Sequence, residues 1–454
     1  RDLGALIAAR RSLGRLHGTR AEELGAVLSN IEALAASGGL GASRLAPLFL
    51  TLERNRDWWT TQPLLANGDR ISFPGSKLVW EYYAGQGLEI QWLATFGRAN
   101  GFFLSGHENA NLRQLLSEAI PLASTRAQGI AWEYMFQFDG GRPAWTSGLS
   151  QGTAIQVLAR AWSRFKDPAY LAAARQALGI FRASPPLGVR VGTHAGSHYA
   201  EYTFAPGDRI LNGFIQALVG LYDYASLTGD PLGLALFEAG DSEARQEVPR
   251  YDTGGWSLYD QFGESSLNYH ELLTEFLQHL CQRTRKGPPA APPAPAAPAP
   301  PAPPAPATPA PPAPAAPGGS PAAPGASATA GARAAAGTSP QAPPIPGDQI
   351  YCTTAQRFTA DLTTPPVITL LSKVLPGGAR AGVQISLSKI STVSLTVRRA
   401  GHVVWTNAAT VEHGRPRLLW LTPSSGGSFS VTLAATDLAG NFATATGTIL
   451  VRRH

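Results

Sequence analysis

The chain has 454 residues, of which 44% are hydrophobic and 15% charged, with a formal net charge of +6 and a pI of about 9.4. Its length allows two or three domains, and its basic balance favours acidic partners. Nucleic acid is not expected, because the sequence has no helix-turn-helix, zinc-finger or aromatic RNA-binding signature.

The first residue is Arg1 and not a methionine, so we expect that a signal peptide or anchor preceded it and was removed. No apolar run is long enough to span a bilayer. The expected location is therefore secreted or at the cell surface, with the signal peptide not visible in this chain.

Residues 1–62 are predicted to form an N-terminal helical arm packed on the domain that follows. Apolar residues recur there at helical spacing, and the second helix is expected to end at Gly38 and Gly39. The arm carries no chemical motif. Its three apolar runs are Leu3, Ile7, Leu13 and Leu16; Leu24, Val27, Leu28, Ile31 and Leu34; and Leu45 to Leu52.

Residues 63–286 read as a mainly helical domain. The stretch from Trp80 to Phe103 begins as a glycine-broken aromatic loop and continues as a helix. A helix with Ser150 as its N-cap follows, and a second starts at Asp167 and Pro168.

A short β-hairpin is predicted between Val189 and Phe204. The helix that begins at Leu211 should end at Gly229, and Asn268 is expected to cap the last helix. Taken together, the pattern predicts antiparallel helical hairpins with one inserted β-hairpin.

Residues 287–347 are almost wholly proline and alanine, a composition that gives a semi-rigid extended linker and no buried core. Beyond it, alternating apolar residues such as Val383, Ile385 and Leu387 predict strands. We assign 348–454 to a C-terminal all-β domain, with an immunoglobulin-like sandwich from about residue 363 to 452.

The two cysteines, Cys281 and Cys352, lie on either side of the linker. A disulfide between them would join the ends of the linker. Two unrelated free thiols are the alternative, and it is slightly favoured. Two cysteines give no zinc-type ligand spacing.

Four motifs stand at the edges of the helical runs. They are Glu201-Tyr202, Leu211-Asn212-Gly213-Phe214, Tyr251-Asp252-Thr253-Gly254 followed by Tyr259-Asp260, and Tyr269-His270. In this order, they resemble the C-terminal catalytic domain of the D-glucuronyl C5-epimerase family, which inverts uronic acids within a polysaccharide. The resemblance covers about residues 80 to 284. This chain departs from the family in the short segment Gly263–Asn268 and in the absence of an N-terminal β-sandwich.

The resemblance implies an incomplete (α/α) toroid and a catalytic set made of Glu201, Tyr202, Tyr259 and Tyr269. Inversion at carbon 5 requires one group that removes a proton and another that delivers a proton to the opposite face. A tyrosine with an ordinary pKa of about 10 can donate, and a glutamate can accept, so a mixed site supplies both functions. Neighbouring residues of a strand face opposite ways, so Glu201 and Tyr202 can both act only at a bend.

The resemblance also suggests substrate-binding residues, each of which has a structural alternative. Aromatic residues could simply pack, a helix-start glutamine could face solvent, Asn212 could cap a helix, and His270 could hold a loop. Arg142, Arg209 and Arg250 are the plausible partners of the substrate carboxylate. The substrate-binding candidates are Tyr82, Tyr83, Gln86, Gln151, Arg209, Asn212, Arg250, Tyr251 and His270.

The expected function is that of a polysaccharide uronate C5-epimerase, an isomerase of the glucuronate/iduronate type, with an acidic polysaccharide as partner. The alternatives are a polysaccharide lyase or glycoside hydrolase on an (α/α) toroid, or a non-catalytic carbohydrate-binding protein. Hydrolysis usually needs two carboxylates, and Glu201 has only Asp252 or Asp260 as a partner. Nothing in the sequence demands a metal or an organic cofactor. The C-terminal domain is expected to serve in spacing or cell-surface attachment, and residues 348–454 are expected to be dispensable for turnover.

Overall fold

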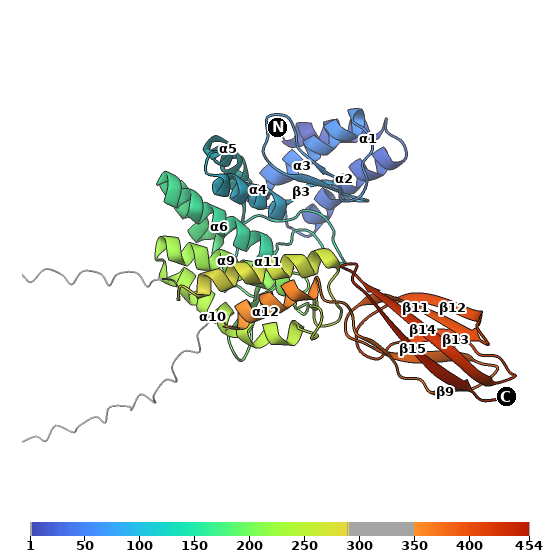
Figure 1. Ribbon diagram of the computed structural model, residues 1–454. Helices are drawn as coiled ribbons and strands as arrows, with labels where there is room; N and C mark the ends of the chain where they lie inside the picture. Colours follow the sequence, from blue (N-terminus) through green and yellow to red (C-terminus); the bar gives the residue numbers. More distant parts are fainter. Residues whose placement is uncertain (1, 288, 290–348, 454) are drawn as a thin grey trace, which may run out of the picture. The chain divides into compact units, whose positions relative to one another are not determined.

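The computed structural model describes residues 2–287, 289 and 349–453 (Figure 1). It is rich in helix up to residue 361 and in strand beyond it. The predicted linker, 287–347, lies outside the described residues except for Gly287 and Pro289. Within the described part of the chain, no helix is long and apolar enough to cross a membrane.

The predicted arm consists of three helices that share one hydrophobic core with the residues after it. Asn55 joins the two parts, because its side chain bonds both the N–H and the carbonyl of Leu88. The arm is therefore packed on its neighbour, as expected. Its helices are α1 (Asp2–Leu13), α2 (Thr19–Ala36) and α3 (Ala42–Thr61).

The aromatic loop is an antiparallel sheet of three short strands, in the order β1-β2-β3. Gly85 and Gly87 have φ of 78° and 85°, so they supply the left-handed conformations that the turn between β2 and β3 requires. The elements here are β1 (Arg70–Ile71), β2 (Trp80–Tyr83), β3 (Gly87–Ile90), α4 (Trp92–Ser105), α5 (Asn109–Ala119), η1 (Ile120–Leu122), β4 (Ser124–Arg126) and β5 (Gly129–Ala131).

Helices α6 (Gly148–Phe165) and α9 (Leu211–Thr228) pack closely in the helical core. A Cβ atom on Gly220 would come within 2.1 Å of the carbonyl oxygen of Gly152, so glycine is what lets the two backbones approach. The N-cap of α6 is Ser147 and not Ser150, because Ser147 Oγ accepts the N–H of Ser150. The helix thus starts three residues earlier than predicted.

The remaining boundaries of the helical domain follow the predicted signals with one exception. Asp167 caps α7, Gly229 ends α9, and the predicted hairpin is formed by β6 and β7. Asn268 does not cap the last helix; Ser266 does, by accepting the N–H of Tyr269. The elements are α7 (Pro168–Ala177), α8 (Gly179–Arg182), β6 (Arg190–Gly192), β7 (Ser197–Tyr199), α10 (Pro231–Glu247), η2 (Val248–Tyr251) and α11 (Leu267–Thr284).

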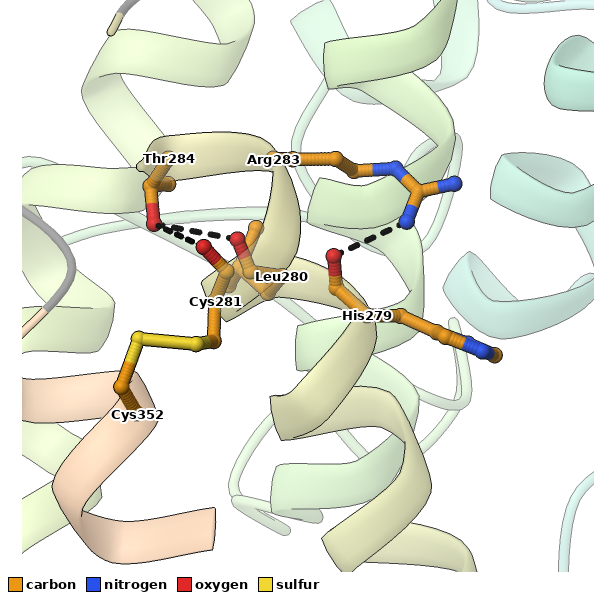
Figure 2. The surroundings of a disulfide bond; sticks show 6 residues. All are labelled: His279, Leu280, Cys281, Arg283, Thr284 and Cys352. Carbon is orange, nitrogen blue, oxygen red and sulfur yellow. Dashed lines mark hydrogen bonds between the residues drawn. A yellow bond between two sulfur atoms is a disulfide. The ribbon is translucent and has the colours of Figure 1, made fainter. Parts of the chain in front are cut away.

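After the linker the chain forms α12 (Gln349–Asp361), which packs in the helical core. The prediction that the all-β domain begins at residue 348 is therefore wrong, because α12 precedes it. Tyr351 and Phe358 are fully buried in the core that holds α6 and α9. Figure 2 shows that Cys281 of α11 and Cys352 of α12 form a disulfide, so the favoured reading of two free thiols is wrong. A chain that ended near Lys286 would lose part of the helical core.

The strands that follow form two sheets, in the orders β13-β10-β8 and β12-β11-β14-β15-β9, around a separate hydrophobic core. Trp420 and Phe429, one from each sheet, meet there with ring centroids 5.2 Å apart. The region is a β-sandwich in this sense; its immunoglobulin-like character stays a prediction. The strands are β8 (Ile368–Leu370), β9 (Val374–Leu375), β10 (Arg380–Leu387), β11 (Ser391–Arg399), β12 (His402–Val411), β13 (Arg417–Leu421), β14 (Gly427–Asp437) and β15 (Phe442–Val451).

Candidate functional site

The Glu201-Tyr202 pair follows β7 and lies against the start of α6. Tyr202 bridges to Ser147, and the N–H of Gly148 bonds the carbonyls of Ala200 and Glu201. A Cβ atom on Gly148 would lie 2.5 Å from the oxygen of Ala200, so a side chain there would push the pair away. The chain bends and turns directly after Glu201, which meets the condition under which both side chains could be used.

Glu201 is the buried carboxylate of the site, with only 8% of its surface exposed. Ser147 Oγ donates to its Oε1 at 2.8 Å, while its Oε2 has no hydrogen-bond partner among the residues that the structure describes. Burial raises the pKa of Glu201 to about 7, and the bond from Ser147 partly opposes this shift. A carboxyl with a pKa near neutrality can both accept and release a proton.

Gly213 explains why glycine stands in the Leu-Asn-Gly-Phe motif. A Cβ atom built on Gly213 would lie 2.0 Å from Glu201 Oε2, so the carboxylate occupies the space that a side chain would fill. The first turn of α9 therefore holds the carboxylate closely. Asn212, the preceding residue, is buried, and within the described part of the chain its Oδ1 has no hydrogen-bond partner.

Three tyrosines from three separate segments meet beside Glu201. The rings of Tyr259 and Tyr269 have centroids 4.6 Å apart, and the hydroxyls of Tyr202 and Tyr259 interact. Burial, together with the neighbouring carboxylate of Glu201, raises the pKa values of Tyr202 and Tyr259 well above their ordinary value. These two phenols are therefore neutral and able to donate. The sequence motifs thus identified four residues that the fold brings together.

Tyr134 and Gln91 also belong to this cluster, and sequence reasoning missed them. Gln91 Oε1 accepts the hydroxyl of Tyr134 at 3.2 Å, and its amide donates to the hydroxyl of Tyr83 at 3.1 Å. The charges of Glu201 and Glu81 add to the burial that raises the pKa of Tyr134. Tyr134 lies in a stretch without helical or strand periodicity, so the only available signal was its Trp-Glu-Tyr setting among aromatic residues.

Three aromatic residues, Trp145, Phe204 and Phe138, pack against the rings of Tyr134 and Tyr202. Trp145 stacks on Tyr134, with ring centroids 4.2 Å apart, and meets Tyr202 edge to face at 5.7 Å. Phe204 stacks on Tyr202 at 5.2 Å, and Phe138 lies 5.7 Å from the same ring. This packing fixes the orientations of the Tyr134 and Tyr202 rings.

Four of the substrate-binding candidates are buried in structural contacts instead. Tyr82 donates to Glu23 in the arm, and Gln151 bonds the backbone of Trp132 through both ends of its amide. The hydroxyl of Tyr251 bonds the carbonyl of Arg209. His270 is fully buried and uses both ring nitrogens on protein partners. Since these groups are already bonded within the protein, substrate contact is not supported for Tyr82, Gln151, Tyr251 and His270.

The other candidates are spread around the cluster. The ring of Tyr83 packs on that of Phe136, with centroids 4.6 Å apart. The side-chain Oε1 of Gln86 accepts from the side-chain amide of Asn30 and from the backbone N–H of Gln137. Arg209 is ion-paired to Glu247, whereas Arg142 and Arg250 are exposed. The latter two have the freedom to meet a substrate carboxylate.

Two hollows in the described part of the chain, of about 420 Å³ and 600 Å³, flank the turn at Ala127 and Gln128, and no catalytic candidate lines either of them. The candidate site is defined by its titratable groups. Among residues 2–287 and 349–453, no group of three or more His, Cys, Asp or Glu side chains could hold a metal ion.

Comparisons with known proteins match the part of the chain that carries the cluster. Residues 126–288 match the family described as D-glucuronyl C5-epimerase C-terminus. The chain is 38% identical over 131 residues to D-glucuronyl C5-epimerase of Caenorhabditis elegans, covering 26% of this chain and 21% of that protein. It is 28% identical over 151 residues to an uncharacterised protein of Methanocaldococcus jannaschii, covering 32% of this chain and 49% of that protein.

A crystal structure of an engineered protein has a TM-score of 0.17 and 17% identity to this chain, covering 24% of this chain and 27% of the other, which supports no argument. The chain spans about a fifth of the worm protein and about half of the archaeal one. The matched residues begin later than the predicted resemblance, at 126 and not at 80, and include Tyr134, Glu201 and Tyr269. The similarity of residues 126–288 to this family supports a uronate epimerase-type function.

Proposed function

We propose that this protein epimerises uronate units at carbon 5 within an acidic polysaccharide, interconverting glucuronate- and iduronate-type residues. The observation that carries the proposal is the buried Glu201 carboxylate, with a pKa of about 7, beside the neutral Tyr202 and Tyr259. One group is poised to take a proton and the others to give one, which is the minimum equipment for inversion.

Glu201 serves as the base on one face of the sugar ring in this proposal. Among the described residues its buried Oε2 has no hydrogen-bond partner, so no protein donor competes for the lone pair that would take the proton from carbon 5. Near pH 7 about half of the molecules hold the carboxylate ionised, because the pKa lies there. The product of that step is a neutral glutamic acid, which burial favours.

A tyrosine delivers the proton to the opposite face. The rings of Tyr259 and Tyr269 have centroids 4.6 Å apart, and Tyr269 is 43% exposed, so it can meet a substrate. Either phenol can donate, and a neutral phenol can also donate a hydrogen bond to the enolate that forms at the substrate carboxylate. Arg142 or Arg250 would neutralise that carboxylate.

Tyr202 resets the site after each turnover. Turnover leaves a protonated Glu201 and a tyrosinate, and Tyr202 interacts with both Glu201 and Tyr259. A proton passing from Glu201 through the Tyr202 hydroxyl to Tyr259 would restore both groups, and exchange of these carboxyl and hydroxyl protons with solvent between turnovers would bring deuterium to carbon 5. The same exchange allows the reaction to run in either direction.

The hydrolase alternative is weakened by the carboxylates that would have to assist Glu201. Asp252 is ion-paired with Arg357 and accepts the N–H of Gly254. Asp260 accepts the N–H groups of Phe262 and Gly263, which holds its own turn together. Both carboxylates are therefore engaged in structural contacts.

A lyase shares the first step and differs in the fate of the carbanion, which would expel the group at carbon 4. Incubation with a panel of uronate polymers in deuterated water, followed by proton NMR, separates the two. Epimerisation predicts deuterium at carbon 5 with intact chains. Unsaturated chain ends without exchange would favour the lyase. If neither deuterium exchange nor unsaturated ends were observed, the result would favour a non-catalytic carbohydrate-binding protein.

We extend the proposal to the whole chain as follows. The helical domain would be an incomplete (α/α) toroid, and the β-sandwich an immunoglobulin-like domain that spaces the protein from, or attaches it to, a cell surface. The protein would be secreted, with the acidic polysaccharide as its partner. A chain that ends at Thr364 retains α12 and all the site residues but loses the bonds that the N–H groups of Ile390 and His413 donate to Glu264 in the Tyr259 loop, so its turnover tests whether residues 365–454 are dispensable.

A further inference from the structure

Helix α12 touches the segments that carry the candidate tyrosines, although the linker separates it from them in sequence. The carbonyl of Phe358 lies 2.9 Å from Nε2 of His270, which directly follows Tyr269. Arg357 is ion-paired with Asp252, the aspartate of the Tyr-Asp-Thr-Gly turn. Two separate contacts thus join α12 to two of the motifs.

His270 has a defined protonation state because of its partners. A carbonyl can only accept, so Nε2 carries the proton that is donated to Phe358. Nδ1 then accepts the N–H of Ser257 at 3.2 Å and lies 2.9 Å from its Oγ. Burial lowers the pKa of His270 to about 4, so the ring is neutral near pH 7 and this pattern of bonds persists.

The contacts of His270 continue directly to the tyrosines. Ser257 stands two residues before Tyr259, and the ring of Trp256 stacks on His270 with centroids 3.7 Å apart. The N–H of Leu211, at the start of α9, bonds the carbonyl of Tyr259 at 3.3 Å. The Tyr259 loop is therefore held by α9 and by His270, in addition to the bonds that Glu264 accepts from the N–H groups of Ile390 and His413.

We propose that α12 is a positioning element of the candidate site, acting through His270 on the loop that carries Tyr259 and on the helix end that carries Tyr269. The proposal rests on the function proposed above. The disulfide between Cys281 and Cys352 keeps α12 against α11 across the long linker, so opening it would weaken this support (Figure 2). Activity should then depend on the redox state of two cysteines that do not touch substrate.

The first test removes the bonds of His270 while keeping its bulk. His270→Phe retains an aromatic ring on Trp256 and loses both hydrogen bonds. Because a displacement of about 1 Å can cost on the order of a hundredfold in rate, we expect kcat to fall roughly tenfold to a hundredfold. KM should stay within about twofold, since His270 does not contact substrate. His270→Gln, which can still donate toward Phe358, should recover part of kcat.

The second test asks whether the disulfide acts along the same path. The double variant Cys281→Ser/Cys352→Ser should lower kcat in the presence of His270 and cause little further loss in His270→Phe. Tyr351→Phe is the matched control, because it removes a bond from α12 to Asp241 that does not lead to the tyrosines. It should lower the Tm slightly and leave kcat per folded molecule unchanged.

A readout that does not need activity separates failure of this proposal from failure of the proposed function. In protein labelled with carbon-13 on its tyrosine rings, opening the disulfide should shift the signals of Tyr259 and Tyr269 and leave that of Tyr82 in place. Unmoved Tyr259 and Tyr269 signals would overturn the proposal whether or not the protein is an epimerase. Normal kcat in a folded His270→Phe variant, or losses that multiply independently with the disulfide variant, would also overturn it.

Discussion

The two ends of helix α9 each hold a carboxylate with little exposure, and their surroundings differ. Near the end of the helix, the half-buried Asp223 is ion-paired with both Arg160 and Arg283. At the start, the buried Glu201 lies against Gly213 with one hydrogen bond from Ser147 and, among the described residues, no cation paired with it. Burial raises the pKa of both groups, but the two arginines hold that of Asp223 below its usual value, while that of Glu201 rises to about 7.

This difference shows which buried carboxylate supports the fold and which is available for chemistry. A paired carboxylate is stable as an anion and has no reason to exchange its proton near neutral pH. An unpaired carboxylate in a buried site lowers the stability of the fold, and its pKa lies near the pH at which a general acid or base must act. A helix N-terminus favours an anion by a fraction of a kcal/mol to about 1 kcal/mol, which is too little to offset burial of Glu201.

The largest effect should come from exchanging each carboxylate for its amide. Glu201→Gln keeps the shape of the side chain and removes the base, so exchange at carbon 5 should fall by roughly a hundredfold to ten-thousandfold. Asp223→Asn should leave exchange per folded molecule nearly unchanged. Deuterium incorporation, normalised to the folded fraction from circular dichroism, measures both. Near-normal exchange in folded Glu201→Gln would contradict the site assignment.

Tyrosine hydroxyls provide a second comparison of the same kind. Tyr259→Phe should lower exchange by a similar factor with little change in Tm, because its hydroxyl lies in the cluster. Tyr82→Phe removes a bond to Glu23 in the arm, so it should cost about 1 kcal/mol of stability and leave exchange intact. If the two variants behaved alike in both assays, the cluster would be packing and not chemistry.

Stability should respond to pH in opposite ways at the two ends of α9. The folded-state pKa of Glu201 is raised above its unfolded value, so its favourable contribution is complete below about pH 4.5 and is lost as the pH rises through 7. Glu201→Gln should therefore unfold like the wild type at pH 4.5 and be more stable at pH 8, by at most roughly 3 kcal/mol.

Asp223 has the opposite sign, because its folded-state pKa is lowered. Its contribution is present above its unfolded pKa and is lost as the pH falls through the folded value. Asp223→Asn should therefore be destabilised at pH 7, by about 3 to 5 kcal/mol, since it breaks a buried pair. Urea unfolding at several pH values measures the free energy of unfolding of both variants. If Glu201→Gln and Asp223→Asn lost equal stability at pH 8, the two carboxylates would not differ in the way described.

The smallest effect concerns Ser147. Its hydroxyl favours the ionised form of Glu201, so Ser147→Ala should raise that pKa and move the acidic limb of the exchange rate to higher pH by roughly one unit. Ser147 also caps α6, so Asp167→Ala, which removes the cap of α7, is the control. The control should lose similar stability, about 1 kcal/mol, with the limb unmoved. If the acidic limb of the exchange rate did not move in Ser147→Ala, the pKa of Glu201 would not determine that limb.

Much of this comparison could be predicted from the sequence, because short motifs marked the helix ends. Gly229 and Asp167 gave correct boundaries, and the motif order gave Glu201 with three tyrosines. The neighbours Tyr82 and Tyr83 show the limit. They face opposite sides of β2, one toward Glu23 and one toward Gln91, and this depends on strand partners that the sequence does not reveal.

Helix α12 shows a second limit. A proline- and alanine-rich stretch usually separates domains, so the residues after it were assigned to the next one. Only long-range contacts, the disulfide to Cys281 and the bond from His270 to Phe358, return α12 to the helical core. Tyr134 was missed for a related reason, since its role depends on Gln91 and Trp145, more than ten residues away on either side.

The most direct measurement follows the carbon-5 proton of a glucuronate polymer in deuterated water at pH 7, with wild-type protein and Glu201→Gln side by side. We expect the wild type to replace the carbon-5 signal with deuterium while chain length is preserved, and Glu201→Gln to lose nearly all of that exchange while remaining folded. Exchange at equal rates in both proteins, or chain cleavage by the wild type, would contradict an epimerase site built on Glu201.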